Sequence, residues 1–329
     1  MGNEGSQPAG LEIEEKAVEA TDAWTLHYAS ISCGNPRLSV FVGQSQEGRS
    51  PAALELSAKN LMLYRHPSIV KYVSSWKRGD CWNLATEEVK PLAEVLPQLT
   101  PIQICLGLHS ILEALIFLHE KAEASHNNIC CASIYVSHDG SWKLGGFENL
   151  CRFKDLTPEF LHRTRTRRYD RGIAPEEEEV NGLKTVKGSI LEPWAIDTYA
   201  FGVLAEELLR SATSRTFGAT STNLSPADEL PALSDFKDLL KKHLQHCNPS
   251  LRAKLSSVLK HPFFSHPLIS IHGFLIDLPL KAESEKEEFF SMRGTSIDAH
   301  EVKEVATVYP ISPPSVPQIP VPLPQQLLL

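Results

Sequence analysis

The segment from 124 to 149, ASHNNICCASIYVSHDGSWKLGGFEN, carries residue types at a spacing that points to phosphoryl transfer. Two patterns serve that chemistry: His-Arg-Asp-x-x-x-x-Asn supplies a base for the attacking hydroxyl, and Asp-Phe-Gly supplies a metal ligand. The first pattern falls on the positions from His126 to Ser133, and the second falls on Gly146, Phe147 and Glu148. The spacing of both patterns is present, but most of the reactive groups are replaced.

The replacements remove the base and the metal ligands. Asn128 stands where the base should be, and its amide cannot accept a hydroxyl proton; losing a positioned base typically costs about 10²–10⁴-fold in rate. Ser133 replaces the amide ligand of a second metal ion, and Cys130 replaces the lysine that faces the phosphate. Gly146 offers no carboxylate to Mg²⁺, which prefers oxygen ligands. The sequence therefore predicts degenerate positions with no catalytic residue, no cofactor and no metal ion.

The other parts of a nucleotide site are also reduced. We expect Glu148 not to replace the lost carboxylate, because its neighbour Phe147 should pack inward. Gly34 is the glycine that remains where a phosphate-binding turn should follow YASIS, so backbone amides cannot wrap a triphosphate. No lysine occurs from 17 to 58, where the strand lysine of a nucleotide site is expected, and Lys59 comes too late in the chain to fill that position. Glu55, at the position of the helix glutamate, is therefore expected to have no strand lysine as its partner.

The elements that must position these residues change character along the chain. From 24 to 89 the sequence is rich in short strand patterns, interrupted by one helix for which Ser50 is the expected N-cap and Pro51 the first residue. Beyond Pro101 the apolar spacing is helical, and the first long helix is expected to be largely buried. This order predicts an α+β protein with two lobes.

Short landmarks in that order resemble a protein kinase. RHPSIVKY at 65–72 resembles the H-P-N-I-V segment that follows the kinase αC helix, and IDTYAFG has Asp197, Phe201 and Gly202 where kinases have the pattern D-x-W-S-x-G. APEE at 174–177 and NPSLRAKL at 248–255 resemble the end of the activation segment and the closing helix. The resemblance implies a bilobal protein-kinase-like fold over 24–266, with a small β-rich N-lobe, a larger helical C-lobe and a structural pair of Glu176 with Arg252.

Within the kinases, three phrases resemble the Scy-like pseudokinases over roughly 20 to 290: HNNICCASIYVSHDGSWKLGGFENLCRF, TPEFL and LKAESEKEEFF. The resemblance implies a catalytically inactive scaffold or adaptor in membrane traffic or in ezrin-linked cytoskeletal and adhesion processes. Ezrin-type proteins and membrane-traffic components are the partners it implies, and a cytoplasmic position on Golgi or other membranes is the location. Members of the family usually continue past EFF into helical repeats, whereas here a proline-rich stretch follows.

The ends of the chain give further predictions. MGNEGS fits the N-myristoylation pattern at Gly2, and one myristoyl chain gives reversible membrane binding. Residues 1–20 are polar and acidic and are predicted to be disordered. A helical extension is expected at 267–290, and a disordered proline-rich tail at 291–329.

Composition excludes several other classes. The formal net charge of -8 argues against a nucleic-acid binder, which needs clustered positive charge. The seven cysteines form no C-x-x-C pair, which favours a reducing, intracellular setting and no zinc site. No signal peptide begins the chain, and its apolar runs are judged too short to span a membrane. The adjacent Cys130 and Cys131 are expected to face the interior.

Two questions stay open from the sequence alone. The basic run at 163–168 is either a docking or phosphorylation site, with Thr164 and Thr166 among arginines, or a solvated loop balanced by the acidic run at 176–179. The chain is either an inactive scaffold or an atypical kinase or other nucleotide-binding enzyme with a degenerate cleft. A third reading is an allosteric activator that docks on a true kinase through its N-lobe.

Overall fold

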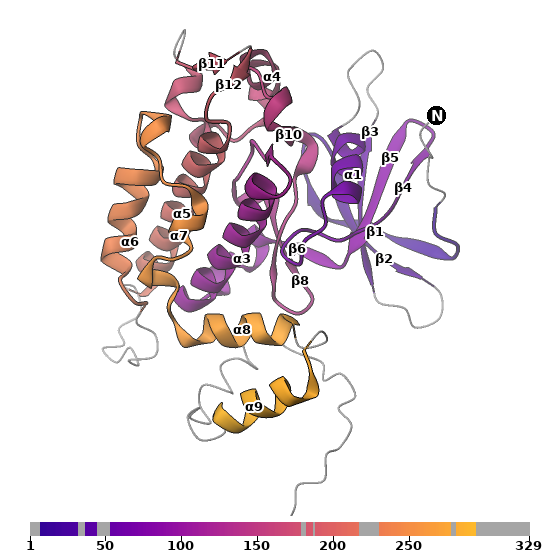
Figure 1. Ribbon diagram of the computed structural model, residues 1–329. Helices are drawn as coiled ribbons and strands as arrows, with labels where there is room; N and C mark the ends of the chain where they lie inside the picture. Colours follow the sequence, from indigo (N-terminus) through magenta and orange to yellow (C-terminus); the bar gives the residue numbers. More distant parts are fainter. Residues whose placement is uncertain are drawn as a thin grey trace, which may run out of the picture. The chain divides into compact units, whose positions relative to one another are not determined.

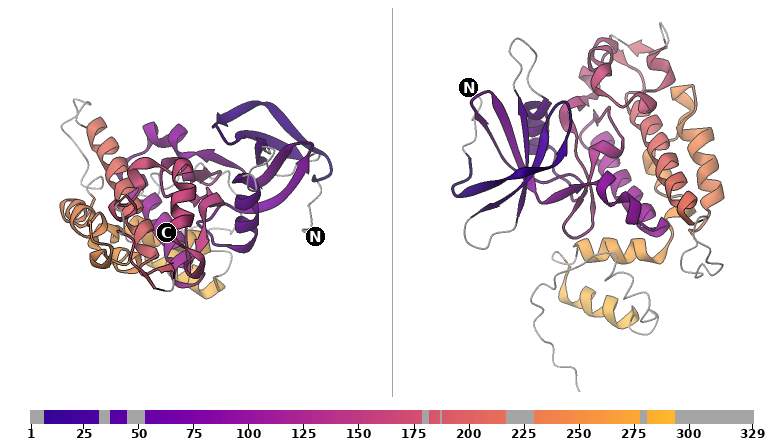
Figure 2. Two further views of the ribbon diagram at one scale, coloured as in Figure 1. Left: turned by 90° about the horizontal axis from the view of Figure 1, so that it is seen from above. Right: turned by 180° about the vertical axis from the view of Figure 1, so that it is seen from behind.

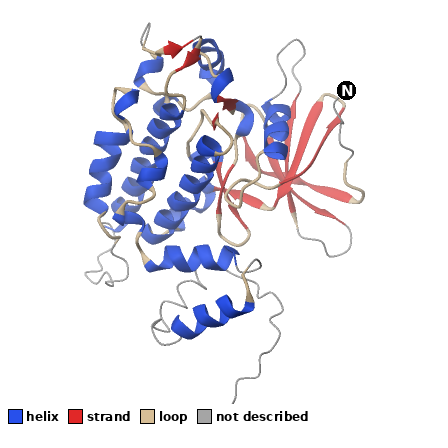
Figure 3. Ribbon diagram, viewed as in Figure 1, coloured by secondary structure: helices blue, strands red, loops and turns tan. Residues whose placement is uncertain are grey.

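The computed structural model describes residues 7–31, 37–44, 53–178, 182–186, 188–216, 230–277 and 281–293. The chain divides into two compact units, Met1–Lys281 and Ala282–Leu329. Strands gather in the N-terminal part of the first unit and helices in the rest of it (Figure 3). This is the two-lobed α+β arrangement that the order of sequence patterns predicts.

The N-terminal lobe is a twisted antiparallel sheet with one helix packed against it (Figure 1). Its strands are β1 (Leu11–Ala20), β2 (Thr25–Ile31), β3 (Leu38–Gln44), β4 (Tyr72–Arg78) and β5 (Cys81–Glu87), and their spatial order is β1-β2-β3-β5-β4. The helix α1 (Ala53–Leu63) buries Leu54, Ala58 and Leu61. Residues 45–52, with the expected cap at Ser50 and Pro51, lie outside the described residues.

Strand β1 corrects the prediction that residues 1–20 are disordered and that the folded region begins at 24. It pairs with β2 along its length, from Leu11 opposite Ile31 to Ala20 opposite Thr25, with two register shifts. The four glutamates of this segment favoured the prediction of disorder, but charged residues are also common in a strand at the edge of a sheet. Leu11 is its one buried residue, and it joins the core formed by Val40 and Trp76.

The C-terminal lobe combines helices with short paired strands (Figure 2). The strands are β6 (Val89–Pro91), β7 (Ala124–Ser125), β8 (Ile134–Ser137), β9 (Trp142–Leu144), β10 (Cys151–Arg152), β11 (Thr185–Val186) and β12 (Ser189–Ile190). The helices are α2 (Leu92–Val95), α3 (Pro101–Glu120), α4 (Pro158–Thr164), α5 (Trp194–Thr216), α6 (Leu233–Leu239), α7 (Leu255–Val258) and α8 (Pro267–Asp277). Sheets form in the orders β6-β8-β9, β10-β7 and β11-β12.

Helix α3 is the central helix of this lobe. Thr100 caps it in a capping box with Gln103, which satisfies backbone amides of the first turn. By length and composition alone α3 is apolar enough to cross a membrane, which overturns the judgement that all apolar runs are too short. In the fold 67% of its apolar window is buried, as expected of a core helix. A side chain at Gly107 would collide with the Trp142 ring, so this glycine lets β9 approach α3 closely.

The residues predicted as a helical extension fall in two helices that belong to different units. In the first unit, α8 buries Leu268, Ile269 and Ile271. In the second unit, α9 (Glu283–Arg293) begins where the side chain of Glu285 accepts a hydrogen bond from the Ala282 amide at 2.9 Å. Residues 294–329, which include most of the predicted proline-rich tail, lie outside the described residues.

Candidate functional site

A cleft of about 430 Å³ brings together most of the residues that the sequence marks. It is lined by the turn between β1 and β2, by β3 and α1, and by loops of the C-terminal lobe. The four positions predicted to be degenerate, Asn128, Cys130, Ser133 and Gly146, all contribute to the lining. These four positions therefore lie in one cleft, and the geometry shows what each side chain does there.

The turn that should bind phosphate is Thr21–Trp24, between β1 and β2, and it contains no glycine. The prediction that Gly34 marks this turn is wrong by one hairpin, because the strand at 11–20 was missed; Gly34 itself lies outside the described residues. The Thr21 hydroxyl accepts hydrogen bonds from the amides of Ala23 (3.3 Å) and Trp24 (3.1 Å). These amides are thus bonded within the turn, and Asp22 adds a negative charge to the cleft lining.

Aromatic rings line one side of the cleft. Trp24 meets Phe41 edge to face, with ring centroids 5.0 Å apart. Phe41 meets Tyr135 in the same way at 5.5 Å. Burial raises the pKa of the Tyr135 phenol well above its ordinary value, so this group stays neutral. The rings present an apolar wall rather than groups that could bind a charged phosphate chain.

Asn128, at the position of the base, is engaged in a structural bond. Its side-chain oxygen accepts a hydrogen bond of 2.9 Å from the backbone amide of Tyr169. The backbone amide of Asn128 donates a hydrogen bond to His126 Nδ1 at 3.3 Å. The side chain therefore ties the loop to the activation segment, and no carboxylate is present to take a proton from a hydroxyl.

Ser133 and Cys130 close their loop on themselves. The Ser133 hydroxyl donates to the Cys130 carbonyl at 2.9 Å and accepts from the Cys130 amide at 3.1 Å. Both side chains are buried, and burial raises the pKa of the Cys130 thiol. Cys131 is only half-buried, which differs from the expected interior position, and burial raises the pKa of its thiol to about 11.

The turn at 146–148 holds a result that the sequence did not predict. Phe147 is fully buried and packs edge to face on His126 at 5.2 Å, as expected. Glu148 nevertheless lines the cleft, a position that the expectation about its metal-binding role did not address. Burial raises the pKa of the Glu148 carboxyl, while the charge of Arg167 acts in the opposite direction.

The chain around Gly146 explains why this position suits glycine. Gly146 has φ of 69°, in the left-handed region, where a side chain is strained. A Cβ atom there would lie 3.0 Å from the Cβ atom of Ser133. Among the described residues no group of three histidines, cysteines, aspartates or glutamates is arranged to hold a metal ion. In that part of the chain Glu148 is therefore not grouped with two further side chains of these types.

Helix α1 carries the acid that an active kinase pairs with a strand lysine. Here Glu55 forms an ion pair of 2.6 Å with Lys59, one turn along the same helix. Strand β3, from Leu38 to Gln44, contains no cation that could reach it. Asn60 ties the helix to the C-terminal lobe by donating to the Phe147 carbonyl at 2.8 Å. The helix is thus held in place without a strand lysine.

The backbone of the loop is held by one buried acid. Asp197 on α5 accepts hydrogen bonds from the amides of His126 (2.7 Å) and Asn127 (2.8 Å). His119 also contacts this carboxylate at 3.0 Å. Burial alone would raise the pKa of Asp197, but these partners lower it below its ordinary value. The support of a catalytic loop is kept although its reactive groups are gone.

The end of the activation segment is fixed by a buried ion pair. The Arg252 guanidinium donates to both carboxylate oxygens of Glu176 at 2.6 Å each, the pairing that the kinase resemblance implies. Arg252 also donates to the carbonyls of His246 (2.8 Å) and Ala195 (3.0 Å). Both ionic side chains are almost completely buried.

Two arginines of the basic run pair with glutamates of the acidic run. Arg165 bonds Glu178 at 2.8 Å, and the buried Arg168 forms a two-pronged bond with Glu177. Thr164 is buried, and its hydroxyl donates to a carbonyl of its own helix at 3.0 Å. That residue is therefore inaccessible in this fold, whereas the neighbouring Thr166 is exposed on the cleft lining.

Sequence reasoning missed three contributors to the cleft. Thr21 lies between the segment predicted to be disordered and the predicted start of the folded region, and it was not considered. Tyr169 matters through its backbone amide, for which the sequence carries no signal. Glu148 was considered only as a replacement metal ligand; its place in the cleft lining depends on the local backbone after the left-handed Gly146.

Comparison with known proteins gives relatives of kinase type, although no protein-family model matches the chain. The mouse (Mus musculus) "Protein-associating with the carboxyl-terminal domain of ezrin" is 35% identical over 292 residues, which are 88% of this chain. The Dictyostelium discoideum "Probable inactive serine/threonine-protein kinase scy1" is 23% identical over 84% of it. The Saccharomyces cerevisiae "Protein kinase-like protein SCY1" is 23% identical over 86%.

These relatives are much longer than the matched segment. The chain covers 37% of the mouse protein, 33% of the Dictyostelium protein and 39% of the yeast protein. What is known of those proteins as a whole therefore reaches this chain only as proposals.

Proposed function

We propose that this chain, which belongs to the Scy-like family over the kinase-like region that it shares with its relatives, is a catalytically inactive scaffold that binds other proteins. The names of the relatives support the inactive-kinase part of the proposal, since one of them is described as a probable inactive kinase. The cleft supports it independently, because the side chains of Asn128 and Ser133 form hydrogen bonds within the protein itself.

One observation carries the proposal. The side-chain oxygen of Asn128, at the position of the base, accepts the backbone amide of Tyr169 at 2.9 Å. An active enzyme needs this position free and anionic so that it can take the proton of the attacking hydroxyl. Here the Asn128 side chain instead connects its own loop to the activation segment by a hydrogen bond.

A titration of the full chain with ATP, with and without Mg²⁺, tests the proposal. A site filled at one hundred times its dissociation constant would stabilise the fold by about 2.7 kcal/mol, which thermal unfolding detects readily. We expect no Mg²⁺-dependent stabilisation at millimolar ATP, and no heat of binding by calorimetry. A saturable, Mg²⁺-dependent shift that Glu148→Gln abolishes would overturn the proposal and favour an atypical nucleotide-binding enzyme.

The second part of the proposal is reversible membrane attachment through a myristoyl group on Gly2. Its support is the sequence MGNEGS, which fits the acylation pattern; Gly2 lies outside the described residues. Co-expression with an N-myristoyltransferase should raise the intact mass by one myristoyl group, and Gly2→Ala should prevent this. Loss of the Golgi or other membrane fraction in Gly2→Ala cells is the expected consequence. An unmodified wild-type chain would refute the anchor.

The third part concerns partners in membrane traffic or in ezrin-linked cytoskeletal and adhesion processes. Its support is the name of the mouse relative, of which this chain covers 37%. The isolated carboxyl-terminal domain of ezrin should bind the purified full chain in a pull-down and in calorimetry. Absence of binding would refute ezrin as a partner of this chain without affecting the inactive cleft.

A further inference from the structure

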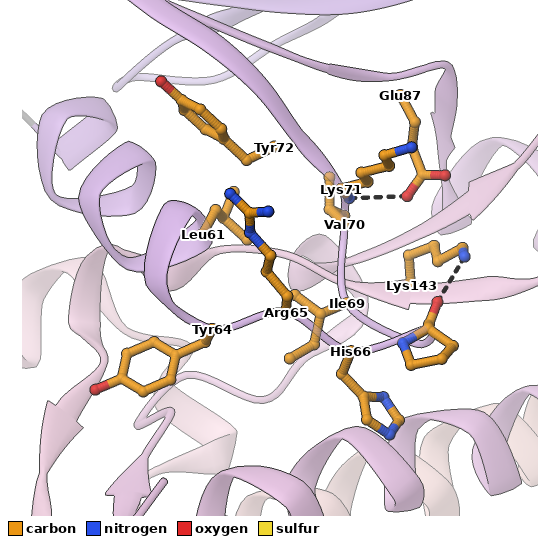
Figure 4. Close-up of a pocket in the computed structure, with 11 residues that line it drawn as sticks. Leu61, Tyr64, Arg65, His66, Ile69, Val70, Lys71, Tyr72, Glu87 and Lys143 are labelled. Carbon is orange, nitrogen blue, oxygen red and sulfur yellow. Dashed lines mark hydrogen bonds between the residues drawn. The ribbon is translucent and has the colours of Figure 1, made fainter.

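A second pocket, of about 370 Å³, lies beyond the carboxyl end of α1 (Figure 4). The loop from 64 to 71 forms most of it, and β9 and the end of β5 complete it. Leu61 and Val70 line this pocket and the interlobe cleft alike, so they form a wall between the two. No residue of the degenerate catalytic positions lines it.

The pocket is held in shape by bonds at both ends of its loop. The Lys143 ammonium donates to the Pro67 carbonyl at 2.6 Å, and the Lys71 amide donates to the Glu87 carboxylate at 2.8 Å, as Figure 4 shows. His66 stacks on Phe117 of α3 with ring centroids 5.2 Å apart. Burial lowers the pKa of His66, so this ring is neutral at physiological pH.

The charges around the pocket are unbalanced. Arg65, Lys71 and Lys143 contribute three cations, and Glu87 is the one acid of the lining. None of the ion pairs formed within the described ranges involves these three cations. On a chain with a net charge of -8, this is a local positive site on an otherwise acidic protein.

Apolar surface accompanies the cations. The floor includes the buried side chains of Ile69 and Val70. Met62 (47% exposed), Leu63 (67%) and Val73 (40%) directly flank the lining residues in the sequence. They are three of the six large hydrophobic side chains that stand exposed among the described residues. Met62 and Leu63 stand exposed at the end of α1, next to the lining residues Leu61 and Tyr64, and exposed apolar side chains there favour a protein contact.

We propose that this pocket docks an acidic segment of a partner protein, with an apolar side chain in the hollow and carboxylates against Arg65 and Lys71. Charge complementarity selects the acidic partner, and the concave apolar floor selects a projecting side chain over a flat lipid surface. The inference deepens the proposed scaffold function by naming a binding surface, but it does not depend on an inactive cleft.

The test uses a displayed library of random dodecapeptides selected on the full chain. Selected peptides should be rich in Asp and Glu around a large apolar residue. Arg65→Glu combined with Lys71→Glu should weaken their binding at least about tenfold, since both exposed cations then repel the peptide. The matched control is Lys77→Glu combined with Arg78→Glu, which makes the same charge change on exposed positions of β4 outside the pocket, and should leave binding within about twofold.

Each outcome decides the proposal. Recovery of no binder, of binders without acidic residues, or of binders equally weakened by the control pair would overturn it. Binding of phosphatidylserine vesicles that the Arg65 and Lys71 changes abolish, without peptide binding, would assign the site to lipid and also overturn it. Unchanged thermal unfolding of both double variants excludes a folding defect. Binding of Mg²⁺-ATP would refute the inactive cleft and leave the docking site standing, so the two failures are distinguishable.

Discussion

The buried ion pair between Glu176 and Arg252 gives the sharpest test of the fold. Replacing Arg252 by Met removes a guanidinium that makes two bonds of 2.6 Å to Glu176 and two more to backbone carbonyls. The exposed fractions of the two side chains are 0% for Arg252 and 5% for Glu176. The carboxylate would therefore remain in a site that water hardly reaches.

The expected cost follows from this burial. Removing one partner of a buried pair typically destabilises a protein by about 3–5 kcal/mol, because the other charge is left without compensation. For a unit of this size that corresponds to a fall in melting temperature of roughly 6–15 °C. Replacing both residues by apolar ones of similar volume should cost less than either single change, since no charge is then stranded.

The assay is urea denaturation of the full chain, followed by tryptophan fluorescence and circular dichroism. Arg165→Met is the matched control, because its ion pair with Glu178 is of the same type but leaves 38% and 61% of the two side chains exposed. We expect that control to cost less than about 1 kcal/mol. If Arg252→Met costs no more than Arg165→Met, or if the double replacement at 176 and 252 is worse than both single ones, the reasoning from burial is wrong.

Three further predictions rest on single side chains. Since the folded state raises the pKa of Glu148, it binds more protons than the unfolded chain as pH rises above the ordinary value of about 4.3, and stability falls there. Glu148→Gln should therefore be more stable than the wild type at pH 7 and equal to it below about pH 4, as measured by unfolding at each pH. Thr164→Asp should destabilise the fold by more than about 2 kcal/mol, because it buries an unpaired charge, whereas Thr166→Asp should change stability by less than about 0.5 kcal/mol; equal effects in thermal unfolding would contradict the burial of Thr164. Maleimide should label the exposed Cys247 at least about tenfold faster than the buried Cys130, whose thiol pKa is raised, and peptide mass spectrometry showing equal rates would exclude the closed loop.

Much of the fold and the location of the site followed from local patterns. The long helix at 101–120 and the alternation of strands before it are periodic over many residues, so their type was clear. The strand at 11–20 was not predicted because it lies at the edge of the sheet, where only Leu11 is buried and Glu12, Glu14 and Glu15 are exposed. That one omission moved the expected phosphate turn from Thr21–Trp24 to Gly34.

The sequence by itself determined which reactive groups the cleft lacks. A missing carboxylate at Gly146, a missing base at Asn128 and a strand β3 without a lysine are facts of residue identity, and no folding can supply the absent groups. The same holds for the retained structural residues, since the pairing of Glu176 with Arg252 needs both side chains at their kinase positions.

Only the tertiary structure decided how the remaining groups are used. The bond from the Tyr169 amide to Asn128 joins residues that are 41 positions apart, and the pairing of Thr164 with its own helix depends on which face of α4 is buried. The direction of Glu148 depends on the left-handed backbone at Gly146. These contacts depend on the backbone path and on long-range packing, which residue types and spacing do not encode locally. Through them the remaining side chains of the cleft connect loops of the fold to one another.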